Sequence, residues 1–421
     1  MPSASRLATA AIPGLLSAGL TGWLLASNSW SSVGVEAMEA KTPSATSFAD
    51  LANITATAKC LADGTDHTVC DPYGRTFQPY VVLPARILAA LGLGPDQTGP
   101  LGIALAVLYV LTVVGLGLWL AAQWRGSLAG LVAGQVALAL GAVTAPAMLA
   151  VERGQIELIT LALAVGALLA LSSQRLLVKI PGAIAGVLAV VSKFFAVGLF
   201  APFVRRGRLN AIALVGLAVS IAYLLLSLSD IQQASAAARA DLPATSKSQF
   251  GSATLVATLL SDSPIGYVPS QSVSDTWPTV RLAGWAVTAV VVIIMALVIP
   301  RTGERALDGS AGARALVIGS TGVLMLPYLL GASHDYRQVF LLPVIAGAVV
   351  WLGVTTGAAR WLPLAVVLAS LVSLATGAAM VPTPSGFIWA KPALVIGDLC
   401  LLFVLATGAG LWVRSLVHRG D

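Results

Sequence analysis

The sequence predicts an all-α polytopic membrane protein, formed as a single integral membrane domain over residues 1–421. Of its residues, 57% are hydrophobic and only 10% are charged, whereas a soluble globular protein has about a quarter of its residues charged. The hydrophobic residues fall into runs long enough to cross a bilayer. Arginine and lysine cluster in the short segments between these runs, which is the pattern of cytoplasmic loops. The net charge of +6 does not indicate nucleic-acid binding, because no basic arm with interleaved aromatic residues is present.

The first apolar run, Leu7–Ala26, follows Arg6. It could be read as a cleavable signal peptide, but it is long enough to span a membrane and no small-x-small cleavage site ends it. We therefore interpret it as an uncleaved first helix with its amino terminus inside. The polar residues 28–78 then form a first outer loop, and residues 81–93 form a short interfacial helix that carries Arg86.

The stretch 181–204 interrupts the alternation of sides, because basic residues such as Arg175 and Arg205 flank it on both sides. Both flanks are therefore predicted to be cytoplasmic, which one simple span cannot satisfy. We expect two half-length helices joined by a re-entrant turn near mid-membrane, buried against protein. Lys193 in this turn needs an anionic partner, and a lipid phosphate, a carboxylate of another helix or snorkelling to the surface can each supply relief.

With this re-entrant pair, the other runs alternate in direction and predict a bundle of about ten spanning helices with both termini cytoplasmic. A second outer loop covers residues 229–280, and its moderately apolar part around Phe250–Leu260 could lie on the membrane surface. The expected spans are residues 7–26, 101–122, 128–151, 156–171, 209–228, 282–299, 315–331, 339–354, 361–380 and 392–413.

The three cysteines divide between two environments. Cys60 and Cys70 share the first outer loop, while Cys400 lies inside an apolar run. In an oxidising compartment the first two can form a disulfide, which stabilises a short loop by roughly 2–3 kcal/mol. Two free thiols are the alternative, and Cys400 is assigned to packing.

Three polar clusters fall on the outer side in this topology. The first surrounds Asp50 in the first outer loop. The second is Glu152-Arg153-Gly154-Gln155 with Glu157, and the third is His334-Asp335-Tyr336-Arg337. Ionisable residues at a span boundary are costly to keep near hydrocarbon and tend to be functional, whereas those in a wet loop cost nothing.

Simpler interpretations of these clusters stay open. The second and third clusters could be interfacial anchors and salt bridges between helix ends. Asp50 alone could be a solvated loop carboxylate. Asp50, His334 and Asp335 could in principle bind a cation, but no His-rich spacing supports zinc, and no metal site is predicted.

In their joint order, these motifs resemble bacterial glycosyltransferase family 87, membrane enzymes of the GT-C class that use polyprenyl-phosphate sugars. The matching segments, in order, are Asp50, Cys70-Asp71-Pro72-Tyr73-Gly74-Arg75, Glu152-Arg153-Gly154-Gln155, Ser192-Lys193-Phe194-Phe195 and Asp335-Tyr336-Arg337-Gln338-Val339-Phe340-Leu341-Leu342-Pro343. The family usually has asparagine at the position of Gln155 and proline at the position of Ala196.

The resemblance implies a GT-C-like bundle that needs no cofactor. It would transfer a sugar, mannose or arabinose, from a polyprenyl-phosphate donor to a glycolipid or polysaccharide of the cell envelope. Transfer would take place on the outer face of the cell membrane. A lipid-linked sugar transporter or flippase is an alternative, although it would favour polar residues along the bundle axis and a repeat of halves. A noncatalytic scaffold in envelope assembly is another.

The resemblance also implies roles for individual residues. Asp50 matches the aspartate that acts as general base on the acceptor hydroxyl, since an inverting transfer needs one carboxylate to take that proton. Cations would stabilise the leaving polyprenyl phosphate, and the others would hold sugar hydroxyls or orient an arginine. The donor-binding residues implied in this way are Glu152, Arg153, Gln155, Lys193, His334, Asp335, Tyr336 and Arg337.

Overall fold

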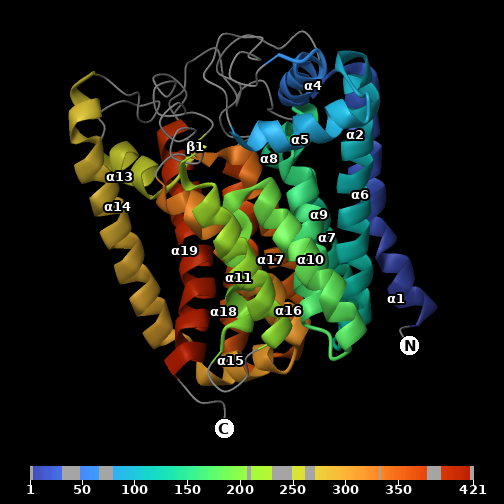
Figure 1. The fold of residues 1–421 in the computed structure, drawn as a ribbon. Helices are drawn as coiled ribbons and strands as arrows, with labels where there is room; N and C mark the ends of the chain where they lie inside the picture. Colours follow the sequence, from blue (N-terminus) through green and yellow to red (C-terminus); the bar gives the residue numbers. More distant parts are fainter. Residues whose placement is uncertain are drawn as a thin grey trace.

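The protein is an all-helical, multi-pass membrane protein whose long helices pack side by side in one bundle (Figure 1). The computed structural model describes residues 3–30, 48–65, 79–205, 210–229, 249–260, 271–330, 333–376 and 390–417. Within these ranges, seven helices are long and apolar enough to cross a membrane, or eight if the bent pair α7–α8 counts as one span. Four shorter apolar helices, α9, α10, η3 and α11, complete the bundle.

The elements follow one another along the chain with few breaks. Their bounds are α1 Ala4–Thr9, α2 Ala11–Ser27, α4 Ala49–Ala62, α5 Pro79–Ala90, η2 Pro95–Gln97, α6 Thr98–Gln123, α7 Leu128–Ala142, α8 Ala145–Glu152, α9 Glu157–Leu171, α10 Leu176–Ser192, η3 Phe194–Phe203, α11 Ala211–Leu226, β1 Gln249–Phe250, α13 Ser252–Leu260, α14 Gln271–Val298, α15 Arg301–Asp308, α16 Ala311–Leu329, β2 Ser333–His334, η5 Asp335–Phe340, α17 Leu341–Val354, η6 Gly357–Arg360, α18 Trp361–Thr376 and α19 Ala390–Val417.

The two ends of the bundle carry different elements. Helices α4, α5 and α8 lie at one end, which we call the α4 end, and α15 lies at the other, the α15 end (Figure 1). Helix α1 and the last turn of α19 lie toward the α15 end (Figure 1). There Arg6 donates a hydrogen bond to the carbonyl oxygen of Trp124 at 3.0 Å, which ties α1 to the connection between α6 and α7.

Helices α10 and η3 form a pair that turns back at Lys193. Lys193 contacts Glu157, the first residue of α9 at the α4 end, while Arg205, just after η3, contacts Asp308 of α15. The turn therefore lies toward the α4 end of the bundle, and the depth of Lys193 in the membrane stays a prediction.

One expected span needs correction. The span expected over 128–151 is bent by 51° between α7 and α8, where Pro146 in the first turn of α8 has no N–H to continue the preceding helix. Helix α14 begins at Gln271, and its part long and apolar enough to cross a membrane is Pro278–Val298, close to the span expected over 282–299. Helix α13 covers the part of the second outer loop that was expected to be moderately apolar. Most of its residues from Ser252 to Thr258 are buried, and α13 packs against α14 and α19.

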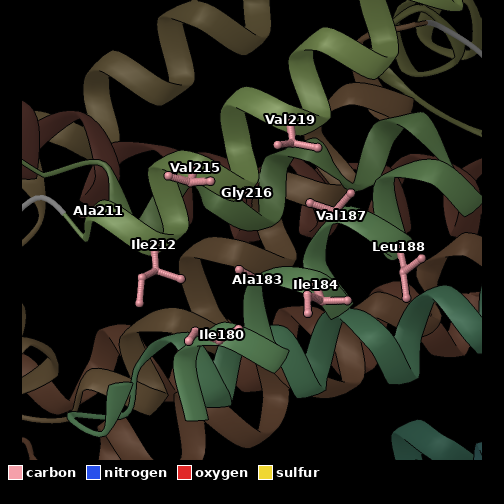
Figure 2. Close-up of a pocket in the computed structure, with 10 residues that line it drawn as sticks. All are labelled: Ile180, Ala183, Ile184, Val187, Leu188, Ala211, Ile212, Val215, Gly216 and Val219. Carbon is pink, nitrogen blue, oxygen red and sulfur yellow. The ribbon is translucent and has the colours of Figure 1, made fainter. Parts of the chain in front are cut away.

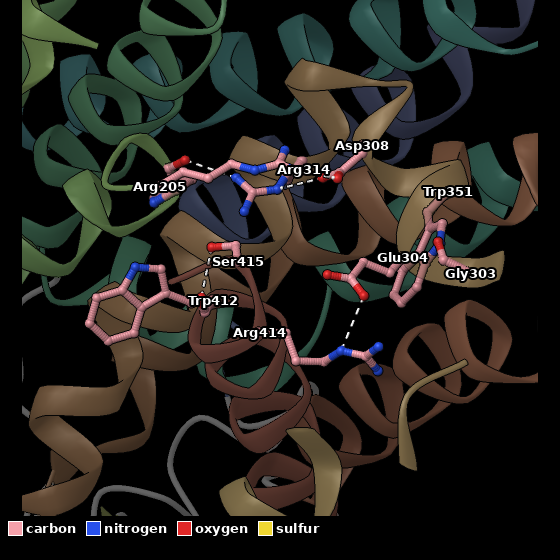
Figure 3. A network of polar contacts seen from close by, with 10 residues as sticks. Arg205, Gly303, Glu304, Asp308, Arg314, Trp351, Trp412, Arg414 and Ser415 are labelled. Atoms are coloured by element: carbon pink, nitrogen blue, oxygen red, sulfur yellow. Dashed lines mark hydrogen bonds and ion pairs between the residues drawn. The ribbon is translucent and has the colours of Figure 1, made fainter. Parts of the chain in front are cut away.

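A polar network closes the α15 end (Figure 3). Asp308 lies 2.6 Å from a nitrogen of Arg205 and 2.9 Å from one of Arg314, and Glu304 lies 3.1 Å from Arg414. Both carboxylates come from α15, whereas the arginines come from the end of η3, from α16 and from α19. The short helix α15 therefore joins three elements of the bundle by ion pairs.

Candidate functional site

The start of α4 is docked on the turn between α8 and α9. The N–H of Phe48 donates to the carbonyl oxygen of Glu152 at 2.5 Å, and the N–H groups of Asp50 and Leu51 donate to that of Arg153 at 3.1 and 3.3 Å. The first N–H groups of a helix have no partner within it, so these carbonyls satisfy them. This main-chain contact fixes where the Asp50 side chain begins.

Two residues, Phe48 and Gly154, determine the geometry of this contact. Phe48 adopts a left-handed φ of 71°, and its buried ring packs against α6 at Gly102, where a Cβ atom would collide with it. Gly154 has a φ of 62°, and a Cβ there would lie 2.9 Å from the Cβ of Leu51. Glycine is favoured at this turn both by its backbone conformation and by the close approach of α4.

Both oxygens of the Asp50 carboxylate accept hydrogen bonds from this turn. Arg153 Nη1 donates to Oδ1 at 3.0 Å, and the side-chain amide of Gln155 donates to Oδ2. The Asp50 side chain keeps 31% of its surface exposed. The carboxylate is thus oriented by two donors and still reachable from outside.

The environment of Asp50 shifts its pKa upward. Burial disfavours the charged carboxylate and is the largest effect, while the neighbouring Arg153 opposes it. The resulting pKa lies above the ordinary value of 3.8, and the charge of Glu157 raises it further. A carboxyl with a raised pKa is a stronger base than an exposed aspartate.

A second cluster of charges centres on Glu157, whose side chain is fully buried. Lys193 Nζ lies 3.1 Å from Glu157 Oε1, and Arg337 Nε lies 3.5 Å from the same atom. The guanidinium of Arg337 also lies 5.3 Å from the ring centre of Phe195 and 5.7 Å from that of Tyr336. Aromatic faces attract cations, so these two rings help to hold Arg337 in place.

Three separate chain segments meet at Glu157. Helix α9 supplies Glu157, the α10–η3 junction supplies Lys193, and η5 supplies Arg337. A hydrogen bond of 2.8 Å between the hydroxyls of Thr160 and Ser192 joins α9 to α10 beside the junction. The strands β1 and β2 pair directly before η5, with Gln249 opposite His334.

The structure brings together most of the residues predicted from the sequence. Asp50, Arg153 and Gln155 form one group. Lys193 and Arg337 contact Glu157, and the ring of Tyr336 lies beside Arg337. Glu152 is buried at the end of α8 and contributes its carbonyl oxygen to the docking of α4. Glu152 ends α8, the next residues form a turn, and α9 begins at Glu157, so the motif lies between the spans expected over 128–151 and 156–171.

Some predicted residues are described only in part. The backbones of His334 and Asp335 directly precede Arg337, but their side chains lie outside the described part of the structure. Cys60, near the end of α4, is disulfide-bonded. Cys70, its predicted partner, lies outside the described residues, so that pairing stays a prediction. Cys400 is a free thiol in α19.

Two buried carboxylates, Glu157 and Asp398, were not assigned a role from the sequence. Glu157 was grouped with the Glu152 motif but was not assigned to the donor site. Asp398, in the apolar helix α19, is 6% exposed and lies close enough to the hydroxyl of Tyr328 to act on it electrostatically. A carboxylate within an apolar run is a signal that sequence inspection can find, because such residues are rare in membrane spans.

A cavity lies away from both charge clusters. It has a volume of about 540 Å³ and lies between α10 and α11, with a lining of aliphatic side chains and glycine from Ile180 to Leu188 and from Ala211 to Val219 (Figure 2). Within the described residues, no group of three His, Cys, Asp or Glu side chains is placed to hold a metal ion.

Comparison of the chain with models of known protein families, with curated proteins and with solved structures found no match.

Proposed function

We propose that this chain is an integral membrane glycosyltransferase that moves a sugar from a polyprenyl-phosphate donor to an acceptor hydroxyl at the α4 end. The observation that carries the proposal is that a candidate base and a cluster of cations lie close together at the α4 end. An oriented, partly exposed carboxylate, Asp50, lies close enough to Glu157 and Lys193 for their charges to influence it. The chemistry needs a base for the acceptor and cations for the departing phosphate, and these two clusters offer both.

In the proposed step, Asp50 accepts the proton of the acceptor hydroxyl as the hydroxyl oxygen bonds to the anomeric carbon of the donor. The bond between that carbon and the phosphate oxygen breaks, and polyprenyl phosphate leaves with the electron pair. A phosphate leaves without a strong acid, so one carboxylate suffices. Lys193 and Arg337 would stabilise the phosphate charge. Arg153 and Gln155 would orient Asp50, which revises the donor-binding role that the resemblance implied for them.

The apolar cavity between α10 and α11 supports a lipid-linked donor (Figure 2). Its aliphatic lining offers van der Waals contacts to an isoprenoid chain that reaches it from the apolar interior of the bilayer. Helix α10 links this cavity to the charges, because Leu188 of the lining precedes Lys193 by little more than one helical turn.

The proposal includes a membrane orientation. We assign ten spans and one re-entrant pair, α10 with η3, and place the α15 end in the cytoplasm and the α4 end outside. The support is the distribution of basic residues, since short cytoplasmic loops are enriched in them. The described basic residues near the α15 end include Arg6, Arg125, Arg175, Lys179, Arg205, Arg301, Arg305, Arg360 and Arg414.

Replacing Asp50 by asparagine tests the function most directly. Wild type and Asp50→Asn are compared in membranes supplied with radiolabelled polyprenyl-phosphate mannose or arabinose, and label is followed into lipid and polysaccharide. We expect loss of about 10²- to 10⁴-fold in transfer rate, the usual contribution of a general base. Asp63→Asn is the matched control, because Asp63 caps the same helix α4 and is exposed.

Each outcome of this experiment decides something. Transfer lost in Asp50→Asn but kept in Asp63→Asn supports the enzyme and its base. Transfer that survives in Asp50→Asn removes Asp50 from the mechanism. If the wild-type protein transfers neither sugar, the proposed enzyme with these donors is wrong, and a transporter or scaffold takes its place.

A further inference from the structure

Glu157 is in an unusual position for a residue of a charged site. It is fully buried, yet both of its cationic neighbours belong to elements that reach the α4 end. Arg337 keeps 17% of its side chain exposed, whereas Lys193 keeps 7%. The cations therefore have Glu157 on the protein side and an approach from outside that is widest at Arg337.

A carboxylate between two cations in an apolar bundle has a clear energetic role. Charges removed from water are costly unless they are compensated, and loss of one partner of a buried pair leaves the others uncompensated. Glu157 supplies this compensation to Lys193 and Arg337 in the described structure. A phosphate that binds the same two cations would do the same with more charge and more acceptor atoms.

We infer that Glu157 is a resident substitute for the phosphate of the lipid ligand, holding Lys193 and Arg337 in place while the site is empty and repelling the phosphate once it is bound. This inference rests on the proposed function, because it takes the ligand to be an isoprenyl phosphate. Glu157 is thus a positioning residue with a second effect: it weakens phosphate binding and promotes release of the polyprenyl phosphate product. A site with two cations and no such carboxylate would hold its product longer.

The inference makes a prediction that a purely structural ion pair does not. Loss of the Glu157 charge should destabilise the empty protein, because two cations lose their compensation. The same change should strengthen phosphate binding, because a like charge is removed from the neighbourhood of the ligand. If Glu157 served only to hold the fold, its loss would weaken ligand binding together with stability.

The experiment uses the full chain in detergent and farnesyl phosphate, a short isoprenyl monophosphate, as the probe. Thermal unfolding and the Kd are measured for wild type and Glu157→Gln. We expect Glu157→Gln to have a lower Tm without ligand, a larger rise in Tm with ligand and a Kd about tenfold lower. Farnesol, which lacks the phosphate, should affect both proteins equally.

Two controls keep the result interpretable. Glu304→Gln removes a carboxylate that pairs with Arg414 at the α15 end, so it should lower the Tm and leave the Kd for farnesyl phosphate unchanged. Glu157→Asp withdraws the charge from both cations by one methylene. It should tighten binding in the same direction by about two- to threefold, and it serves if Glu157→Gln does not fold.

The outcomes separate this inference from the proposed function. If wild type and both Glu157 variants fail to bind farnesyl phosphate, the polyprenyl-phosphate donor is wrong and both proposals fall. If wild type binds the probe but the Glu157 variants bind it equally or more weakly, the inference is overturned and the proposed function stands. Tighter binding with a lower Tm in the empty protein supports both.

Discussion

The two ends of the bundle use the same kinds of charged residue in different ways. At the α15 end, the arginines also donate to main-chain carbonyls: Arg314 Nη1 donates to that of Pro202 at 2.8 Å, and Arg414 donates to that of Ile299. Each of these arginines therefore occupies a carbonyl at the end of another helix as well as a carboxylate of α15. At the α4 end, Arg153 and Lys193 meet side-chain carboxylates, and Arg337 lies over aromatic rings.

We interpret the α15 end as a structural network and the α4 end as the candidate site. Donors that satisfy the last carbonyls of helices stabilise helix ends, which lack partners of their own. At the α4 end, Arg153 and Gln155 instead orient both oxygens of one carboxylate, Asp50, which the proposed transfer uses as its base. We therefore expect changes at the α15 end to alter stability and leave chemistry alone, and changes at the α4 end to alter chemistry first.

The largest test of this comparison uses two glycines with the same backbone conformation. Gly154 at the α4 end has a φ of 62°, and Gly357, the first residue of η6, has a φ of 61°. A Cβ at Gly154 would press on Leu51 and Phe48, whereas one at Gly357 would meet nothing within 4 Å. Gly154→Ala should displace Asp50 and reduce transfer by about 100-fold, the effect of a misplacement of about 1 Å.

Gly357→Ala is the matched control for Gly154→Ala. Both variants carry the strain of a left-handed alanine, about 1–2 kcal/mol, so both should unfold at a lower temperature. Only Gly154→Ala should lose transfer per mole of folded protein. Equal loss of transfer in the two variants would contradict the docking of α4 as the feature that positions Asp50.

A second test breaks the network at the α15 end. Asp308→Asn removes the carboxylate that joins Arg205 to Arg314. Because the Asp308 side chain is 25% exposed, we expect a loss of about 1–3 kcal/mol of stability, between the values for exposed and buried pairs. Thermal unfolding in detergent measures the loss, and the transfer rate per folded molecule should not change. A large drop in that rate would mean that the two ends are coupled.

The sequence predicted the positions of the helices better than the bend between α7 and α8. Apolar runs with basic residues between them locate helices well, because bilayer thickness and the cost of charge in lipid restrict both. Runs such as 209–228 and 361–380 match α11 and α18 within a few residues. The bend between α7 and α8 lies within one apolar run, and hydropathy does not report a break inside such a run.

The sequence predicted many of the residues of the candidate site but not which of them contact one another. Asp50 and Arg153 are 103 residues apart, and no local pattern shows that they form an ion pair. The sequence indicated that Lys193 needs an anion, and the structure supplies Glu157 from α9. Gly154 shows most clearly what the sequence does not predict. Its role depends on the main-chain contact between its turn and α4, which is present only in the folded protein.

The smallest expected effect is a shift in pH dependence at the α4 end. Arg153 lowers the pKa of Asp50 against the effect of burial, so Arg153→Gln should leave burial less opposed and raise that pKa further. Asp50 must be deprotonated to act as a base, so the acid limb of kcat/KM should move to higher pH by about one unit.

The same reasoning fixes the sign of the linkage to folding and the choice of control. Because the pKa of Asp50 is raised in the folded protein, its contribution to stability is fully present at low pH and is lost as pH rises through that pKa. Burial thus destabilises the charged form of Asp50, which transfer requires, relative to its protonated form. The positive charge of Arg153 reduces this destabilisation. Arg414→Gln, at the α15 end, should lower the Tm without moving the acid limb. An acid limb that stays in place in Arg153→Gln would show that another group, not Asp50, takes the acceptor proton.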